Sequence, residues 1–246
     1  MRRCGDRYDK IVLVTRKRSD FCILGLQTFN AIRLQGRNLK TVHQPRIGVL
    51  AIQGDYAAHA TALAEAGATP SLVKTVEDLR LDSASLDGLV LPGGESSTML
   101  KFLERRELFH ALELFCRNRP VFGTCAGAIL LAREVLNPSQ RSLGLLDAIV
   151  ERNAYGRQID SSIVVTPSKL PGGPLEMVFI RAPRIRAVGP GVELLAERDG
   201  FPTLVRQGSV LAATFHPELS RDRRVHRFFI DLVTQSPTER IQKIGA

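Results

Sequence analysis

The stretch VFGTCAGAILLA, Val121 to Ala132, places one cysteine among small residues between two apolar runs. The first run has the character of a strand buried on both faces, and the second reads as a helix. Glycines flank Cys125 in a G-x-C-x-G pattern, the cysteine form of the sharp strand-to-helix turn called a nucleophile elbow. The pattern predicts Cys125 at the apex of such a turn. The alternative is an inert cysteine in a tight connection, because free cysteine is among the most buried residue types.

The chain around this unit alternates between strand-like and helix-like segments. Strands are expected over residues 46–53, 69–73, 86–91 and 119–123, and helices over 56–66, 96–118 (one or two helices) and 126–134. Such alternation indicates a parallel sheet with helices on both faces. Short strands separated by Gly and Pro then indicate antiparallel additions to the sheet, over residues 148–152, 176–181, 193–196, 203–206 and 210–215, before a closing helix over 223–234. We therefore expect one three-layer, mostly parallel α/β domain.

Charge divides the 246 residues unevenly. Residues 1–45 hold ten Lys/Arg and three Asp/Glu, whereas residues 46–246 hold 24 and 22, so the net charge of +9 lies mostly in the first part. We expect a basic N-terminal extension over 1–45, either disordered or the product of an assigned start upstream of the true one. The domain is expected over 46–235 and a tail over 236–246. The nearly neutral body carries no basic stripe interleaved with aromatic residues, so nucleic acid is not an expected partner.

Hydropathy and cysteine usage set the expected compartment. No apolar run approaches the roughly 20 residues that span a bilayer, so no membrane association is expected. The four cysteines show no CxxC or other metal-binding spacing. Free thiols fit a reducing environment, and we expect a cytoplasmic protein with neither a metal nor a cofactor.

A base and an orienting carboxylate for Cys125 stand in the run FHPE, residues 215–218. If a strand ends at residue 215, then His216 and Glu218 lie two positions apart and point to one side. The carboxyl ends of parallel strands meet at one edge of the sheet, which would bring this run to the elbow. We predict Cys125 as nucleophile, favoured as thiolate at a helix N-terminus, with His216 as base and Glu218 as orienter. The alternative is a surface histidine and glutamate in a loop.

The stretch LPGGESST, residues 91–98, ends a predicted strand and opens a predicted helix. Its two glycines allow backbone N–H groups to turn inward, as an oxyanion hole requires. We predict the N–H groups of Gly94 and Ala126 as the donors. A simpler interpretation, compatible with the first, is a turn in which Ser96 or Ser97 caps the helix.

Other polar residues receive plainer interpretations. Gln53, at the end of the first strand, is a weaker candidate for lining the pocket. His59 is interpreted as a capped or exposed helix residue, and His110 and His226 as helix-surface residues. Cys116 has helical spacing from an apolar neighbour and is expected in the core.

The cysteine elbow, the PGG loop and the HPE run occur in the order that is typical of triad-type (class I) glutamine amidotransferases. Within that class the chain resembles the glutaminase subunits of pyridoxal 5′-phosphate synthase. The stretches that carry the resemblance are GVLAIQGD (48–55), LPGGESSTM (91–99), GTCAGAILLA (123–132), ERNAYGRQ (151–158), FIRAP (179–183), FHPEL (215–219) and DRRVH (222–226). The resemblance covers about residues 46–233 and implies a flavodoxin-like fold.

The resemblance also implies a reaction and a partner. The protein would hydrolyse L-glutamine to L-glutamate and ammonia through a thioester on Cys125. The ammonia would pass, within a hetero-oligomer, to a barrel synthase subunit that makes pyridoxal 5′-phosphate, the vitamin B6 cofactor. The residues implied in glutamine binding are Gly94, Glu95, Ser96, Arg152, Ile180 and Arg181. An arginine facing the α-carboxylate is chemically sensible.

One segment departs from the family pattern. The family usually has Phe-Glu after an Asp-Ser pair, whereas Ser162-Ile163 follows that pair here. None of the three predicted catalytic residues is altered by this difference. We expect it to affect local packing or contact with the partner subunit.

Three alternative functions remain open at this point. A glutaminase for another synthase, such as imidazole glycerol phosphate synthase, is disfavoured by the RNAYGRQ stretch. A non-enzymatic binding module of the same fold would not need a complete cysteine, histidine and glutamate set. A peptidase or chaperone of related fold would not be expected to carry HPE after its last strand. A glutaminase assay with and without the barrel partner is the experiment that best tests these alternatives.

Overall fold

The computed structural model describes residues 44–80, 86–154 and 161–235. Apart from residues 44 and 45, the predicted extension lies outside the described residues, as does the predicted tail at 236–246. The helices are α1 (Tyr56–Ala66), α2 (Ser96–Arg105), α3 (Leu108–Asn118), α4 (Ala126–Leu131) and α5 (Arg224–Gln235). The strands are β1 (Arg46–Leu50), β2 (Thr69–Val73), β3 (Gly88–Leu91), β4 (Val121–Thr124), β5 (Ala132–Leu136), β6 (Leu146–Glu151), β7 (Ser161–Thr166), β8 (Leu175–Ile180), β9 (Arg184–Val188), β10 (Glu193–Arg198), β11 (Phe201–Gln207) and β12 (Val210–Ala213).

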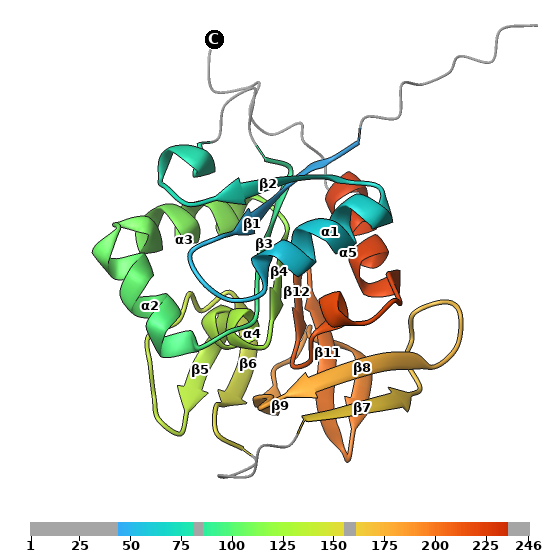
Figure 1. The fold of residues 1–246 in the computed structure, drawn as a ribbon. Helices are drawn as coiled ribbons and strands as arrows, with labels where there is room; N and C mark the ends of the chain where they lie inside the picture. Colours follow the sequence, from blue (N-terminus) through green and yellow to red (C-terminus); the bar gives the residue numbers. More distant parts are fainter. Residues whose placement is uncertain (1–43, 81–85, 155–160, 236–246) are drawn as a thin grey trace, which may run out of the picture. The chain divides into compact units, whose positions relative to one another are not determined.

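A seven-stranded sheet in the order β10-β11-β12-β4-β3-β1-β2 forms the centre of the predicted domain (Figure 1). The five strands from β12 to β2 are parallel, and β11 and β10 extend the sheet in the antiparallel sense. The predicted three-layer, mostly parallel fold is confirmed. The predicted antiparallel additions are confirmed for β10 and β11. The prediction is wrong for three other runs, because β6 pairs with β5 and β9, β8 pairs with β7, and β12 pairs with β4 in parallel.

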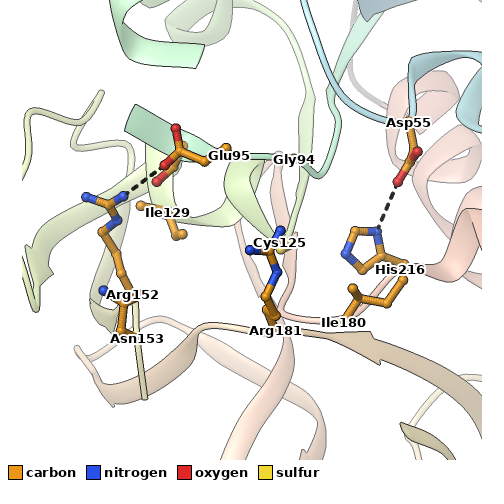
Figure 2. Close-up of a pocket in the computed structure, with 11 residues that line it drawn as sticks. Asp55, Gly94, Glu95, Cys125, Ile129, Arg152, Asn153, Ile180, Arg181 and His216 are labelled. Atoms are coloured by element: carbon orange, nitrogen blue, oxygen red, sulfur yellow. Dashed lines mark hydrogen bonds and ion pairs between the residues drawn. The ribbon is translucent and has the colours of Figure 1, made fainter. Parts of the chain in front are cut away.

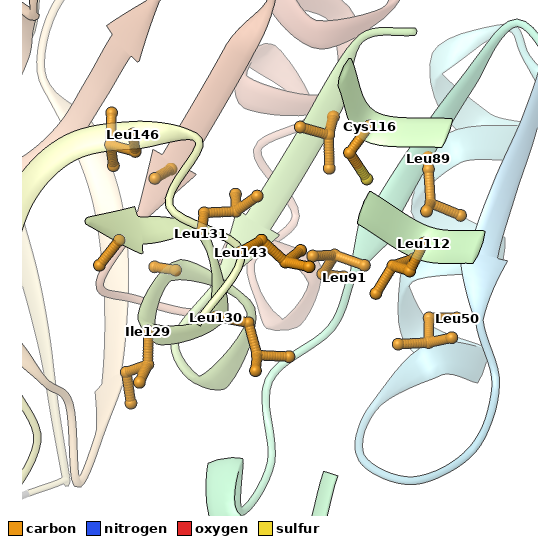
Figure 3. Close-up of a cluster of buried hydrophobic side chains, with 14 of the residues drawn as sticks. Leu50, Leu89, Leu91, Leu112, Cys116, Ile129, Leu130, Leu131, Leu143 and Leu146 are labelled. Atoms are coloured by element: carbon orange, nitrogen blue, oxygen red, sulfur yellow. The ribbon is translucent and has the colours of Figure 1, made fainter. Parts of the chain in front are cut away.

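Alternate residues of the central strands pack against different helical layers. Leu89 and Leu91 of β3 pack with α2, α3 and α4, whereas Val90 between them packs with α1 and α5. Figure 3 shows part of the first layer, where Leu91 lies among side chains from α3 and α4. Because both faces of the sheet are covered, its strands read as continuous apolar runs rather than as alternating ones.

Several predicted elements change at their ends. The helix predicted over 126–134 stops at Leu131, because Ala132 is extended (ψ 150°) and begins β5, which pairs in parallel with β6. The segment 96–118 divides into two helices at Glu107, which has a positive φ of 57°. Strands β5, β7 and β9 are not among the predicted elements. In β7, Ile163 is 68% exposed. Its apolar side chain therefore does not produce the pattern expected of a buried strand.

No helix within residues 44–80, 86–154 and 161–235 is long and apolar enough to cross a membrane.

Candidate active site

The elbow around Cys125 has the predicted strand–turn–helix geometry. Cys125 connects β4 to α4 with φ 46° and ψ −101°, a strained conformation for a residue other than glycine. Its N–H donates a hydrogen bond to the carbonyl of Ala213, at the end of β12 (2.9 Å). A Cβ on Gly127 would lie 2.0 Å from the carbonyl oxygen of Leu91, so α4 crosses β3 too closely for any larger residue. The small residues of the motif are therefore needed for this crossing.

Strand register brings the separate parts of the site together. Leu91 at the end of β3 lies opposite Gly123 of β4, and Thr124 of β4 lies opposite Ala213 of β12. The PGG loop, the elbow and the segment leading to His216 therefore leave adjacent strands at the same edge. This is the carboxyl edge of the parallel sheet, where sites of such folds form.

His216 and Glu218 lie together, as their spacing predicts. The N–H of His216 donates to the carbonyl of Val178 (2.8 Å), and a 3-10 turn (Pro217–Leu219) follows. His216 Nδ1 lies 2.7 Å from Glu218 Oε1, and both side chains are buried. This separation allows the carboxylate to fix the orientation of the imidazole.

The electrostatics of His216 favour a charged imidazole beside the thiol. Burial alone would lower the pKa of His216, but hydrogen bonds to Cys125 and Glu218 outweigh it and raise this pKa to about 10. A cation next to a cysteine favours the thiolate, which is the nucleophilic form. Both side chains face the same pocket (Figure 2).

The glycine loop after β3 packs directly on this histidine. A Cβ on Gly93 would lie 2.3 Å from His216 Cε1. Gly94 has φ +142°, a conformation that L residues rarely adopt. Gln53 accepts a hydrogen bond from the N–H of Glu95 (3.4 Å) and donates one to its carbonyl (3.1 Å). Gln53 therefore holds the loop after β3 in place, and it is not among the residues that line the pocket beside Cys125.

Glu95, rather than Ser96 or Ser97, caps α2. Its carboxylate accepts hydrogen bonds from the N–H groups of Ser97 (3.1 Å) and Thr98 (2.5 Å). Burial would raise the pKa of Glu95, but hydrogen bonds from Ser97 and Thr98 outweigh it and hold this pKa at about 2. The serine cap predicted from the sequence is wrong, because the longer glutamate side chain reaches both donors from the position before the helix.

Arg152 extends this network across the pocket mouth. Its Nη2 lies 3.2 Å from Glu95 Oε1 and 3.1 Å from Ser97 Oγ, and its side chain is only 12% exposed. Figure 2 shows this ion pair, and Arg181, which follows β8, lines the same pocket. Two guanidinium groups and a carboxylate in one small pocket suit a zwitterionic amino acid.

The pocket has a volume of about 220 Å³. Eight predicted site residues line it: Gly94, Glu95, Ser96, Cys125, Arg152, Ile180, Arg181 and His216. Glu218 lies behind His216 and does not line the pocket. Ala126 does not line it either, but it begins α4, where first-turn N–H groups have no partner within their own helix.

Three lining residues are absent from the prediction: Asp55, Ile129 and Asn153. Asp55 follows β1 at the same sheet edge as Gln53. Its position after this strand could therefore have predicted it as a pocket residue. Asp55 Oδ2 lies 3.8 Å from His216 Nδ1. Asp55, His216 and Glu218 bring ligand atoms within 4.8 Å of one another, a spacing that could hold a cation. The hydrogen bond between His216 and Glu218 already accounts for this cluster.

Two histidines were assigned to the wrong environment. His59 and His226 are fully buried, whereas His110 is exposed as predicted. Cys116 lies in the core, which confirms its prediction. The burial of His59 and His226 arises where α1 and α5 face each other, a contact that neither helix reveals alone.

Comparison with known proteins places the chain in a family. The profile of the SNO glutamine amidotransferase family matches residues 49–235. The chain is 57% identical over 188 residues to pyridoxal 5′-phosphate synthase subunit PdxT of Koribacter versatilis (strain Ellin345), covering 76% of this chain and 95% of the relative. It is 48% identical over 191 residues to the subunit of that name from Thermotoga maritima, covering 76% and 99%.

A solved structure agrees with these relatives. A crystal structure of a glutamine amidotransferase is 43% identical and superposes with a TM-score of 0.70, covering 76% of this chain and 98% of that one. The resemblance seen in the sequence motifs is confirmed. The chain belongs to the SNO glutamine amidotransferase family.

Proposed function

We propose that this protein is the glutaminase subunit of a pyridoxal 5′-phosphate synthase. It hydrolyses L-glutamine to L-glutamate and ammonia and delivers the ammonia to a synthase subunit. The observation that carries the proposal is that Cys125 and His216 face one pocket with Arg152, while Glu218 Oε1 lies 2.7 Å from His216 Nδ1. The relatives are named as subunits of this synthase, which supports the choice of pathway.

The reaction proceeds in two steps. The Cys125 thiolate attacks the side-chain amide carbon of glutamine, and the N–H groups of Gly94 and Ala126 stabilise the oxyanion. The His216 imidazolium gives its proton to the departing nitrogen, which leaves as ammonia, and a thioester remains on Cys125. Neutral His216 then takes a proton from water, whose oxygen attacks the thioester and releases glutamate. Glu218 holds the imidazole in the tautomer that both steps need.

Substrate binding uses the charged rim of the pocket. Arg152 and Arg181 face the α-carboxylate of glutamine, and the carboxylate of Glu95 faces its ammonium group. Ile180 and the backbone of Gly94 line the remaining space. The hydrolysis needs no metal or cofactor, because thiolate, imidazole and water supply all the reacting groups.

The synthase subunit docks over the edge of the sheet that carries the pocket, so that ammonia does not escape to water. We assign to it a barrel fold, by resemblance to the family. The catalytic domain spans 46–235, with an extension over 1–45 and a tail over 236–246, and the complex works in the cytoplasm. A subunit for another synthase is less well supported, since the relatives carry the name of this one.

The test is ammonia and glutamate release from L-glutamine by the full chain mixed with its synthase subunit. Cys125→Ala is expected to lower kcat by at least about 10³-fold, as loss of a catalytic nucleophile does. Cys116→Ala is the matched control, because this thiol is buried in the core, away from the pocket. Ammonia release that survives Cys125→Ala contradicts the proposal.

A further inference from the structure

Two buried histidines behind the pocket have no part in the reaction described above. His59 of α1 and His226 of α5 are both 0% exposed, and His59 Nδ1 lies 3.3 Å from His226 Nε2. On its other side, His59 Nε2 lies 3.0 Å from Thr124 Oγ1 and 3.2 Å from Glu218 Oε2. His59 thus contacts both the carboxylate behind His216 and the residue that precedes Cys125.

The Glu218 carboxylate needs a donor at this position. Its Oε1 lies 2.7 Å from His216 Nδ1, and its side chain is fully buried. Within the described parts of the chain, Oε2 has no hydrogen bond of regular geometry, and the ring nitrogen that faces it, at 3.2 Å, is His59 Nε2. A buried carboxylate is costly to keep ionised unless donors face both oxygens.

The two histidines can supply that donor in an ordered way. Burial, reinforced by the neighbouring His226 and His216, lowers the pKa of His59. Burial, reinforced by Arg223, lowers the pKa of His226 to about 3. Both rings are therefore neutral near pH 7, and each carries one N–H and one lone pair.

The contacts favour one arrangement of these protons. When the His59 proton is on Nε2, this N–H points toward Thr124 and Glu218. His59 Nδ1 then accepts a hydrogen bond from the N–H at His226 Nε2. His226 Nδ1, which has no partner among the residues described, is then a lone pair. The opposite arrangement leaves an N–H of His226 buried without an acceptor and sets two lone pairs against each other at Glu218, which is unfavourable.

We propose that His59 is a positioning residue of the glutaminase. Its Nε2–H, held in place by His226, keeps the Glu218 carboxylate turned toward His216. The proposal rests on the proposed function, because it assigns His59 to the same catalytic machinery. His59 does not line the pocket, so it acts through Glu218 and not on the substrate.

The kinetic test compares two side chains of matched size at position 59. His59→Gln keeps an amide N–H close to the place of Nε2, whereas His59→Met fills the space without a donor. In the full complex with L-glutamine, His59→Met is expected to lower kcat per titrated active site by about 10- to 100-fold, the usual effect of losing an outer group that orients a reactive one. KM is expected to stay within about twofold, and His59→Gln to recover most of kcat.

Equal kcat values for His59→Gln and His59→Met, whether both high or both low, overturn the proposal. Active sites are counted with an electrophilic glutamine analogue that alkylates Cys125, so a loss of folded protein does not lower the measured kcat. His110→Met is the control for a histidine-to-methionine change, because His110 is exposed on α3 and lies outside the pocket. It is expected to retain the kcat of the unchanged protein.

A second measurement uses the unchanged protein, so it does not depend on whether a variant folds. In the unchanged full chain labelled with nitrogen-15 in histidine, the His59 ring is expected as the neutral Nε2–H tautomer near pH 7. A neutral Nδ1–H tautomer overturns the proposal. If the unchanged complex releases no ammonia, the proposed function fails, while the tautomer still decides whether His59 donates toward Glu218.

Discussion

Gly93 lies against the imidazole of His216. A Cβ on residue 93 would be 2.3 Å from Cε1 and 2.9 Å from Nδ1 of that ring. The ring has little freedom to withdraw, because Nδ1 is held 2.7 Å from Glu218 Oε1. The loop after β3 therefore limits the position of the His216 ring.

Gly93→Ala is expected to force the His216 ring out of its present position, against the hydrogen bond to Glu218. Misplacement of a reacting group by about 1 Å can cost about 100-fold in rate, so we expect kcat for ammonia release to fall by about that factor. The control is Gly208→Ala, in the turn between β11 and β12, where an added Cβ meets nothing within 4 Å. A Gly93→Ala enzyme with kcat near that of the unchanged protein would show that the ring relaxes freely.

Gly127→Ala is expected to act on stability. The added Cβ would lie 2.0 Å from the Leu91 carbonyl oxygen, and both backbone segments are buried. Forcing α4 away from β3 is expected to lower the free energy of unfolding by about 3 kcal/mol, the upper end for overpacking. Urea titration measures the change. Gly208→Ala, which adds backbone strain without a clash, is expected to cost less, and the reverse order would contradict the prediction.

Arg152→Met is expected to weaken glutamine binding more than turnover. A hydrogen bond to a charged group contributes about 1.5–3 kcal/mol, so KM for glutamine should rise by about 10- to 100-fold while kcat changes less. Steady-state kinetics of the complex measure both values. Arg117→Met is the control, since this arginine forms an exposed ion pair with Glu113 on α3. An unchanged KM for Arg152→Met would remove this arginine from the binding site.

The raised pKa of His216 predicts a pH dependence of folding stability. The folded state binds this proton more tightly than the unfolded state, whose pKa is near 6.5, and the folded pKa is about 10. The contribution of His216 is therefore complete below pH 6.5 and is lost as the pH rises toward 10. Urea titrations across this range should show a larger decline for the unchanged protein than for His216→Gln. Parallel curves for the two proteins would contradict the raised pKa.

The parts of the site that lie on local motifs could be predicted from the sequence. Small residues around Cys125 permit only one kind of turn, and the spacing of His216 and Glu218 places both on one side of the chain. The cap of α2 was assigned to the wrong residue, because side-chain reach decides between Glu95 and the serines after it. Short motifs fix the backbone here, whereas competition between neighbouring side chains needs coordinates.

The surroundings of the site depend on long-range contacts and were not predictable in the same way. His59 sits in an alanine-rich helix whose pattern gives no clear buried face, and its environment comes from α5 and from Glu218, more than 150 residues later. Ala132 belongs to an apolar run that suits a helix, yet pairing with β6 draws it into a strand. In both cases a tertiary contact outweighs the local preference.

The place of β12 in the sheet has a consequence for how the enzyme is made. This strand lies between β4 and β11, and among the described strands it is the last to be synthesised. Cys125, which follows β4, precedes β12 by more than 80 residues, so its thiol emerges from the ribosome well before the His216 imidazole that we propose as its base. Until β12 inserts beside β4, His216 is not held next to Cys125. The order of strands therefore ties assembly of the cysteine–histidine pair to completion of the fold.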